Sequence, residues 1–314
     1  MVVPDRQEGP RGFRVREAAP GEAGRLAALQ RKCLEVCPDM DEQPPVFFEN
    51  PGFDGGRNIF CAVDGEGPGE RLLGYALVFR LPDPAYLYLD VKVDPGLPDP
   101  EAVRDAVFER VLARAREIKA GYPPYQETLL YGCCFTSGAA SLDYLAGKGF
   151  TRHEPLCVYT MVRDLSEPVP KVPIPLGVEV RPWALDTEEE LSRYLLAHNA
   201  SLPYNYLDPE AFRGLLAARP ATVFGAFAGA EVAGSATVIS GDGVGTIEYL
   251  FVSGPWRGRG VGRCLVRAAL RHFVEKGLSR AELAVATENS GARALYESMG
   301  YRVTREAVSL AMHL

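Results

Sequence analysis

Glycine and arginine alternate in the short segment from Arg257 to Arg263, between an apolar run and a long helix-like run. Glycines let the backbone turn tightly and approach a ligand, so the free amides of a following helix turn can point at one anion. The positive end of the helix dipole and the neighbouring guanidinium groups favour a phosphate at the same place. The segment therefore predicts a binding site for a pyrophosphate.

A glycine-rich loop is weak evidence by itself, and an ordinary surface loop with scattered arginines remains an alternative. The dinucleotide fingerprint Gly-x-Gly-x-x-Gly does not fit, because Gly258, Gly260 and Gly262 are evenly spaced by two. No lysine follows the glycines as a phosphate-binding loop requires. A nicotinamide or ATP site is therefore not expected here.

Two motifs in the C-terminal part of the chain follow each other in a specific order, separated by a helix-like and a strand-like run. They read Arg257-x-x-Gly260-x-Gly262 and Asn289-x-x-Ala292-x-x-Leu295-Tyr296-x-x-x-Gly300-Tyr301. Together they resemble the motifs of the GNAT superfamily of N-acyltransferases. The resemblance covers residues 178–314 and implies acetyl-CoA as the co-substrate.

By this resemblance the strand before the glycines seats the pantetheine and the thioester, with a backbone amide as donor to the developing oxyanion. Tyr296 is placed to protonate the departing thiolate, although a tyrosine packed at a helix end remains an alternative. Asn289 caps the following helix, hydrogen bonds to the coenzyme, or does both. The residues expected to bind acetyl-CoA are Leu250, Phe251, Val252, Arg257, Gly258, Arg259, Gly260, Val261, Gly262, Arg263, Asn289, Ala292 and Arg293.

Glu248 is the candidate base for the amine proton. It precedes Val252 by four residues, so the period of two of a strand points it to the face of Leu250 and Val252. Several members of the superfamily use a carboxylate on this strand, so the resemblance implies the role. A solvent-facing glutamate remains an alternative. Asp242 and the segment from Tyr204 to Tyr206 are further candidates for contact with the acceptor.

Four prolines between Pro168 and Pro175 hold the chain extended and remove backbone donors. The sequences on the two sides are similar, since Phe13-Arg-Val-Arg-Glu parallels Val178-Glu-Val-Arg-Pro, and a tandem repeat is the economical explanation. The arrangement is similar to that of the mycothiol synthase family within the superfamily. We expect a degenerate first copy in residues 1–165, a proline-rich linker at 166–176 and an acetyl-CoA-binding domain in 177–314.

The first copy lacks the anion site at the corresponding place. After the strand-like run 87–93 its sequence is Asp94-Pro-Gly-Leu-Pro-Asp-Pro-Glu101. Here prolines replace amide donors, and carboxylates repel a pyrophosphate. We expect this half to bind acetyl-CoA poorly and to serve as a scaffold or as a wall of the acceptor pocket.

Apolar periodicity predicts interleaved helices and strands in both copies. Helices are expected at 22–36, 101–119, 138–147, 188–200, 209–218, 260–276 and 290–299. Strands are expected at 59–63, 72–81, 85–93, 128–135, 156–162, 223–227, 232–240, 246–252, 280–286 and 308–312. The predicted fold class is α/β with a mixed, mostly antiparallel sheet, which the resemblance makes a tandem GNAT fold.

Composition and charge restrict the class of protein. The 314 residues, of which 47% are hydrophobic and 24% charged, suit a globular protein of two domains. The formal net charge of −7 argues against general nucleic-acid binding. No apolar run reaches the roughly 20 residues of a membrane-spanning helix, and the start of the chain lacks an apolar signal region. We expect a cytoplasmic protein without a membrane partner.

The seven cysteines and four histidines are irregularly spaced, which argues against a structural zinc, and no metal is expected. Free thiols in a reducing compartment are the expected state. Cys264 lies just inside the helix after the glycines, where the dipole could lower its pKa. We nevertheless expect Cys264 to be a packing residue.

These features predict an acetyl-CoA-dependent N-acetyltransferase that acts on a primary amine of a small molecule in its C-terminal half. Monomer and homodimer are both compatible with the sequence. Acetylation of a protein or peptide amine is one alternative, and a non-catalytic acyl-CoA-binding sensor is another. An interaction module without affinity for the coenzyme is a third. Neither the acceptor nor the preferred acyl chain follows from the sequence.

Overall fold

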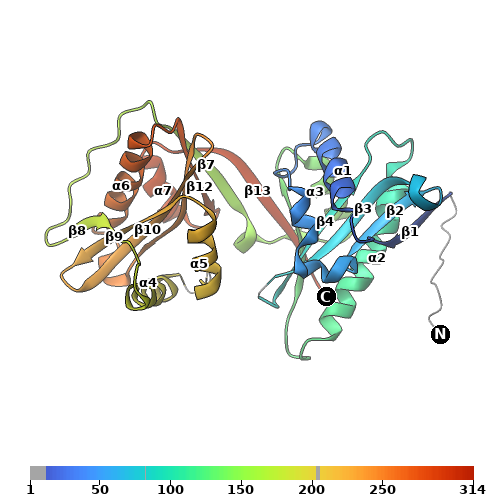
Figure 1. Cartoon of the computed structure of the whole chain (residues 1–314), viewed down its shortest axis with the longest axis horizontal. Coiled ribbons are helices and arrows are strands. Elements are labelled where there is room, and N and C mark those ends of the chain that lie inside the picture. The colour runs from blue at the N-terminus through green and yellow to red at the C-terminus, as the bar shows by residue number, and fades with distance from the viewer. Residues whose placement is uncertain (1–11, 82, 203–205) are drawn as a thin grey trace. The chain divides into compact units, whose positions relative to one another are not determined.

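The computed structural model describes residues 12–81, 83–202 and 206–314, so the acceptor candidates Tyr204 and Asn205 lie outside the described residues. Contacts divide the chain into two compact units (Figure 1). The first unit extends to Cys157 and also contains the last residues, Ala307–Leu314. The second unit is Val158–Glu306. Each unit is a mixed sheet covered by helices.

The sheet of the first unit has the order β1-β2-β3-β4-β5, followed by the C-terminal part of β13, which also pairs with β6. Its strands are β1 (Phe13–Glu17), β2 (Ile59–Asp64), β3 (Arg71–Arg80), β4 (Tyr86–Val93), β5 (Leu129–Phe135) and β6 (Thr151–Arg152). Its α-helices are α1 (Ala23–Val36), α2 (Pro100–Ala120) and α3 (Ala139–Gly147). Short 3₁₀ segments occur at Pro45–Glu49, Pro51–Gly56, Gly67–Gly69 and Glu154–Leu156.

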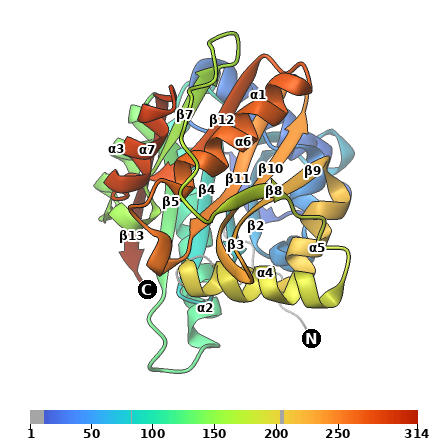
Figure 2. The same ribbon diagram turned by 90° about the vertical axis from the view of Figure 1, so that its left-hand side faces the viewer.

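The sheet of the second unit has the order β7-β12-β11-β10-β9-β8. Its strands are β7 (Val158–Asp164), β8 (Glu179–Pro182), β9 (Ala221–Ala228), β10 (Glu231–Gly241), β11 (Val244–Val252) and β12 (Arg280–Ala286). Its helices are α4 (Glu188–Ser201), α5 (Pro209–Ala218), α6 (Val261–Glu275) and α7 (Ser290–Ser298), with a 3₁₀ segment at Gly254–Trp256. Figure 2 shows α6 lying across the strands of this sheet.

Two apolar cores cover the sheet of the second unit, one with α6 and α7 and the other with α4 and α5. Helix α6 belongs to the first core because its apolar side chains recur every three or four residues, as Leu265, Ala269 and Phe273 do. These side chains are fully buried. The helix ends before Gly277, whose φ of 71° is left-handed. Packing along its whole length therefore fixes the position of the N-terminus of α6.

Strand β13 (Arg302–His313) contributes to both units. Its Ala307–His313 part pairs antiparallel with β5 of the first unit, whereas β7 pairs antiparallel with β12 of the second. The sequence predicts the 156–162 strand for the first copy and the 308–312 strand for the second. The structure shows the reverse, because β7 belongs to the second unit and the end of β13 to the first. Apolar alternation identifies a strand but does not select its partner, because every strand of a sheet shares the same period.

The parallel strand pair of each unit separates part of the way along its length. Strands β4 and β5 are in register from Tyr86 and Leu129 only as far as Leu89 and Gly132. Strands β11 and β12 are in register only as far as Ile247 and Leu283. The last residues of β4 and β11 therefore extend beyond their parallel partner while remaining paired with the antiparallel strand on their other side.

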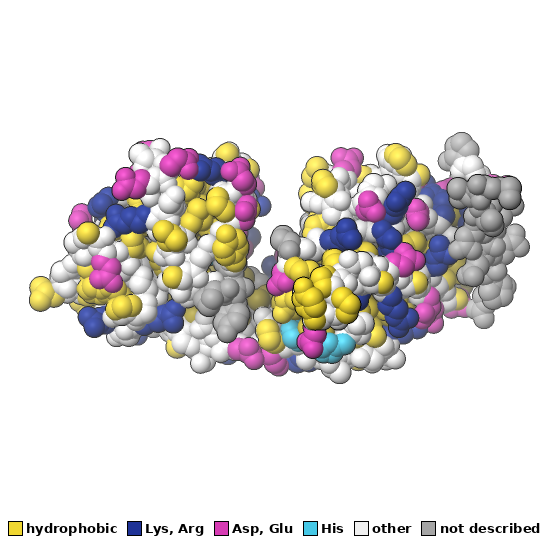
Figure 3. Space-filling model, turned by 90° about the horizontal axis from the view of Figure 1, so that it is seen from below, with side chains coloured by type: hydrophobic (Ala, Val, Ile, Leu, Met, Phe, Trp, Pro, Cys, Tyr) yellow, Lys and Arg dark blue, Asp and Glu magenta, His cyan; other side chains and the backbone are white. Residues whose placement is uncertain are grey.

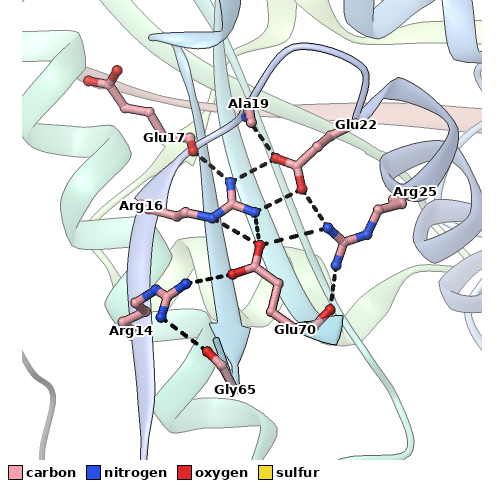
Figure 4. A network of polar contacts seen from close by, with 8 residues as sticks. All are labelled: Arg14, Arg16, Glu17, Ala19, Glu22, Arg25, Gly65 and Glu70. Atoms are coloured by element: carbon pink, nitrogen blue, oxygen red, sulfur yellow. Dashed lines mark hydrogen bonds and ion pairs between the residues drawn. The ribbon is translucent and has the colours of Figure 1, made fainter. Parts of the chain in front are cut away.

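A network of charged side chains links β1 to the residues just before α1 and β3 (Figure 4). The guanidinium of Arg16 on β1 contacts both carboxylate oxygens of Glu22, which precedes α1, and also contacts Glu70 before β3. Arg14 pairs with Glu70, and Arg25 pairs with both Glu22 and Glu70. The hydrogen bonds from Arg16 hold the pKa of Glu22 below its usual value. This network fixes β1 and the start of α1 to the edge of the sheet.

The predicted α/β class with a mixed sheet is confirmed, and all the predicted helices occur with ends within one residue of those expected. Residues 165–178 contain no helix or strand, as expected from their prolines. This proline-rich segment lies within the second unit, where Val169 and Val172 pack against the core of α6. The expected domain limits at 165 and 177 therefore differ from the limits of the compact units.

Candidate functional site

The segment between β11 and α6 has the backbone that the glycines were expected to provide. Gly258 and Gly260 have φ values of 74° and 87°, in the left-handed region that residues with a side chain rarely adopt. Gly260 is the N-cap residue of α6. No side chain caps this helix end, and the first backbone hydrogen bond to Gly260 O comes from Cys264, at 3.2 Å. The amides of Val261, Gly262 and Arg263 thus have no acceptor within the helix, and this helix end favours an anion.

Gly262 allows three elements to meet closely. A Cβ atom at this position would lie 2.7 Å from Leu295 Cδ1 of α7 and 3.5 Å from Val252 Cγ2 of β11. At a distance below 3 Å the Leu295 side chain would have to move to admit a Cβ atom, so glycine permits this close packing. It brings the first turn of α6 next to the helix that carries Tyr296 and to the end of β11. The two motifs of the sequence therefore meet at this point.

The predicted arginines are not equivalent in the structure. Arg257 is held by the backbone, because its Nε donates to Val252 O at 3.1 Å and its Nη2 donates to Ser201 O at 2.9 Å. Arg259 lies over the ring of Trp256, with 5.3 Å between Cζ and the ring centroid. Arg263 is exposed at the first turn of α6. Arg257 thus positions the loop, and Arg259 and Arg263 are the cations best placed for an external phosphate.

Arg293 of α7 forms an ion pair with Glu297 at 2.8 Å and lies 5.1 Å from the ring centroid of Tyr159. Asn289 is the N-cap of α7, since its Oδ1 accepts from the amide of Ala292 at 3.0 Å. The capping alternative for Asn289 is therefore present in the structure. Its carboxamide nitrogen still offers a donor to a ligand.

Leu250, Phe251 and Val252 lie on the part of β11 beyond its register with β12. On the other side they pair with Ala236, Ser235 and Gly234 of β10. Backbone groups directed towards the β12 side at this level lie outside the ladder. This is the geometry that the thioester site was expected to have.

The alternation of side chains along β11 is broken at Glu248. The register with β10 passes from Tyr249 opposite Thr237 to Ile247 opposite Val238, which makes Glu248 the extra residue of a bulge. Ile247 and Leu250 consequently pack in the same core although they are three positions apart. The period of two therefore does not give the direction of Glu248, so its placement on the face of Leu250 and Val252 loses that support and its role as base stays a prediction. Bulges redirect side chains next to active sites.

Tyr296 is 6% exposed and packs in the core between α6 and α7, with its ring centroid 5.9 Å from that of Tyr301. Burial raises the pKa of Tyr296 to about 12. Its phenol therefore keeps the proton at neutral pH, as an acid must before it acts.

Some residues near the site were not predicted, and one candidate lies far from it. Arg163 of β7 is buried and donates to Met299 O at the end of α7 and to Pro168 O of the proline-rich segment. Cys264 Sγ donates to Pro173 O at 3.4 Å, and burial raises its pKa, so Cys264 packs as expected. Asp242 lies at the end of β11 opposite to the glycine loop and is not brought to the site.

The corresponding helix end of the first unit is closed by its own side chains. The carboxylate of Asp99 caps α2 by accepting from the amide of Ala102 at 3.3 Å. Asp94 accepts from the amide of Gly96 at 2.8 Å and pairs with Lys32 and Arg71. Carboxylates thus occupy the positions that an external anion would need.

The surface and the metal-binding side chains give further observations. On the face drawn in Figure 3, basic and acidic side chains are interspersed over both units. None of the described helices has both the length and the apolar character needed to cross a bilayer. Within the described ranges, no three or more His, Cys, Asp or Glu side chains gather where they could hold a metal ion.

Comparisons with known proteins add to this geometry. Residues 185–301 match the family described as "Acetyltransferase (GNAT) family". Mycothiol acetyltransferase from Thermobispora bispora is 31% identical over 178 residues, and the match covers 52% of this chain and 58% of that protein. The chain therefore spans a little over half the length of this curated relative.

Solved structures resemble the chain along nearly its whole length. A GCN5-related N-acetyltransferase from Sphaerobacter thermophilus has a TM-score of 0.75 at 19% identity, over 97% of this chain and 96% of its own. A tandem GNAT protein from the clavulanic acid biosynthesis pathway has a TM-score of 0.68 at 18% identity, over 96% and 98%. At these identities the likeness concerns the fold, which is the tandem arrangement expected from the sequence.

Proposed function

Because residues 185–301 match the acetyltransferase (GNAT) family, we propose that the second unit transfers an acetyl group from acetyl-CoA to a primary amine of a small molecule. The observation that carries the proposal is the uncapped N-terminus of α6. Its first-turn amides, the left-handed glycines before it and the nearby Arg259 and Arg263 form a cradle for a diphosphate. The closely packed Gly262 holds this cradle beside Tyr296.

The separation of β11 from β12 supports the placement of the thioester. An acyl carbonyl beside Leu250–Val252 would lie along backbone that is outside the parallel register. A backbone amide there would donate to the oxygen that becomes negative when the amine attacks. The nitrogen–carbon bond forms as this charge develops, and the carbon–sulfur bond then breaks. Holding the two reactants in this geometry supplies much of the rate by itself.

Tyr296 is the proposed acid and Glu248 the proposed base. The attacking amine must be neutral, so its extra proton passes to Glu248, directly or through a water molecule. The sulfur that leaves takes its proton from the phenol of Tyr296, whose pKa burial raises to about 12. The nitrogen loses a second proton as the amide forms, and this proton, passed on through water, restores the phenol of Tyr296. Glu248 releases the first proton to solvent, so each turnover converts the ammonium form of the amine and acetyl-CoA into the amide, the free thiol and one proton. Glu248 is half-buried on its bulge, where it is accessible to an acceptor.

The small-molecule acceptor rests on the relative rather than on the geometry. Mycothiol acetyltransferase of Thermobispora bispora is named for a small molecule, and the tandem neighbour comes from a biosynthetic pathway for another. A small acceptor is therefore the first class to test. Acetyl-CoA serves as co-substrate, and the protein is proposed to work without a metal.

Two assays test the proposal in sequence. Acetyl-CoA should raise the melting temperature of the full chain by mass action, because it binds the folded state only. Release of free coenzyme thiol is then measured over a panel of small amines and, separately, with peptides. Thiol release with a small amine supports the proposal. Turnover with peptides alone would mean that the acceptor is a peptide amine rather than a small molecule. Tight binding of acetyl-CoA without turnover would indicate a sensor.

A further inference from the structure

A buried charged cluster lies in the first unit, on β4 and on the segment that follows α1. Lys92 Nζ is 2.8 Å from Asp90 Oδ1 and 3.1 Å from Asp39 Oδ2. All three side chains are less than a tenth exposed. Two carboxylates share one ammonium, so one negative charge within the cluster is not balanced. Such a buried charge is costly unless another partner is present.

The hydrogen bonds of the cluster leave acceptor capacity. Asp39 Oδ2 accepts from Lys92 and from Ser141 Oγ at 2.7 Å, whereas Asp39 Oδ1 is buried without a partner among the described residues. Asp90 Oδ2 accepts from Tyr75 OH at 3.1 Å. A carboxylate offers about four acceptor positions, so both side chains can take further donors. The remaining acceptor positions of Asp90 therefore suit a further donor, and a cation fits the charge of the cluster.

Neighbouring charges do not supply this partner. Arg104 lies near the cluster, because it lines a small hollow together with Asp39 and Lys92. Its guanidinium pairs with Glu101 and lies 5.0 Å from the ring centroid of Tyr144. Lys32 and Arg71 pair with Asp94. The cations around the cluster thus have carboxylates of their own.

Asp90 borders two hollows, whereas Asp39 borders only the smaller one. One of about 30 Å³ is bordered by Asp39, Lys92 and Ser141. The other, of about 250 Å³, has an apolar and aromatic wall with two amides and is bordered by Gln30, Met40, Gln43, Phe47, Phe79, Leu81 and Tyr88 as well as Asp90. Aromatic ring faces attract cations, and this effect grows when water is excluded.

We propose that the larger hollow, here called the Asp90 pocket, binds a primary ammonium ligand with an apolar body. The ammonium group would donate to Asp90 and balance the charge of the cluster. The apolar body would lie against Phe47, Phe79 and Tyr88. The first unit would then be a binding site for a small amine, separate from the α6 site.

The charged cluster is particular to the first unit. Lys92 is the last residue but one of β4, and the residue at the same place on β11 is Phe251. Phe251 is buried among aromatic side chains, with its ring centroid 5.8 Å from that of Tyr194. The second unit therefore has an apolar contact where the first has an ion pair, so the charged cluster at the Asp90 pocket is not a feature that the two units share.

Calorimetric titration of the full chain with benzylammonium chloride and with benzyl alcohol tests the proposal. The two probes have similar shape, and only the first has a charge. Benzylammonium is expected to bind with one site per chain and at least about tenfold more tightly than the alcohol, because hydrogen bonds to charged groups are the stronger ones. Equal affinities, or no binding of either probe, would overturn the proposal.

Three variants locate the binding. Leu81→Trp fills the Asp90 pocket from its half-buried rim without touching the ion pairs and should abolish binding. The control Val46→Trp adds the same indole at a side chain that is 67% exposed and should leave binding unchanged. Asp90→Asn should lower the affinity for benzylammonium at least about tenfold and leave that for benzyl alcohol unchanged. If Leu81→Trp binds as the unaltered chain does, the site is elsewhere and the proposal is wrong.

The melting-temperature shift with acetyl-CoA is measured on the same variants. Because the Asp90 pocket lies in the first unit, Leu81→Trp should keep this shift in full. A far-ultraviolet circular dichroism spectrum equal to that of the unaltered chain shows that the first unit of the variant is folded. Failure of benzylammonium binding would leave the proposed acetyl transfer intact, and absence of the acetyl-CoA shift would leave the Asp90 pocket intact.

Discussion

The helix that follows the central strand begins differently in the two units. In the first, α2 starts at Pro100 with Asp99 as a side-chain cap, and Asp94 fills the preceding loop with its own ion pairs. In the second, α6 starts after the left-handed Gly260 without any side-chain cap. Both helices have a positive N-terminal end, yet the chain's own carboxylates neutralise only the first. The second is open to an external anion.

The strand arrangement does not distinguish the two units in this way. Both parallel pairs separate after four registered residue pairs, so the space for an extended ligand arm is common to both. In the first unit this region contains the buried ion pairs of Lys92. The comparison teaches that the fold provides the opening, and that helix capping and buried charge decide whether a coenzyme can use it.

The largest effect is expected from Gly260→Asp. The variant places a side chain at a φ of 87°, adds a negative charge to the anion site and should abolish acetyl-CoA binding. Gly277→Asp is the matched control, because it adds the same charge at a φ of 71° at the other end of α6, with no atom within 4 Å of the new Cβ. The melting-temperature shift with acetyl-CoA should vanish in the first variant and persist in the second. Equal shifts would place the site elsewhere.

Tyr296→Phe should lower kcat by about 10²-fold and leave the KM for acetyl-CoA nearly unchanged, as loss of a general acid does. Tyr301→Phe is the control, since this tyrosine packs against Tyr296 and its hydroxyl is buried without a partner among the described residues. It should keep full activity. Steady-state thiol release measures both. Similar losses in the two variants would indicate packing rather than acid catalysis.

Glu248→Gln should lower kcat by about tenfold, which is below the usual range for loss of a general base. The loss should shrink at high pH, where the amine is already neutral. Glu282→Gln is a comparison on the adjacent strand β12, where the side chain pairs with Arg280 at 2.8 Å. A pH profile of Glu248→Gln parallel to that of the unaltered chain would remove Glu248 from the role of base.

Asp99→Ala tests the closed helix end of the first unit. Loss of an N-cap side chain should lower the free energy of unfolding by about 1 kcal/mol, measured by denaturant unfolding. The acetyl-CoA shift should not change, because the remaining Pro100 and the Asp94 ion pairs still disfavour an anion there. A second equivalent of coenzyme bound by this variant would contradict that reading.

The smallest effect concerns acid. Burial alone would raise the pKa of Asp94, but hydrogen bonds from Lys32, the Gly96 amide and Arg71 outweigh it and lower the pKa from 3.8 to about 2. The stabilisation by Asp94 is therefore present above about pH 4 and lost as the pH falls through about 2. Asp94→Asn should reduce the acid dependence of unfolding over this range. An unchanged dependence would mean that other carboxylates control it.

The sequence was sufficient to predict the helices, the mixed sheet and the meeting of the two motifs, because these depend on local periodicity and on glycines with special backbone angles. It was insufficient for the exchange of β7 and β13, since an alternating strand does not specify its neighbour. The bulge at Glu248 could not be predicted either, because one extra residue in a strand does not change the composition. The hydrogen bonds of Arg257 to Val252 O and Ser201 O also do not follow from the sequence, and its contact with the coenzyme stays a prediction.

A crystal structure of the chain with coenzyme A tests the central claim most directly. The account predicts one coenzyme per chain, with its diphosphate on the amides of Val261, Gly262 and Arg263 and its sulfur within hydrogen-bond reach of the Tyr296 hydroxyl. A diphosphate at the N-terminus of α2, or a coenzyme remote from α6, would contradict it.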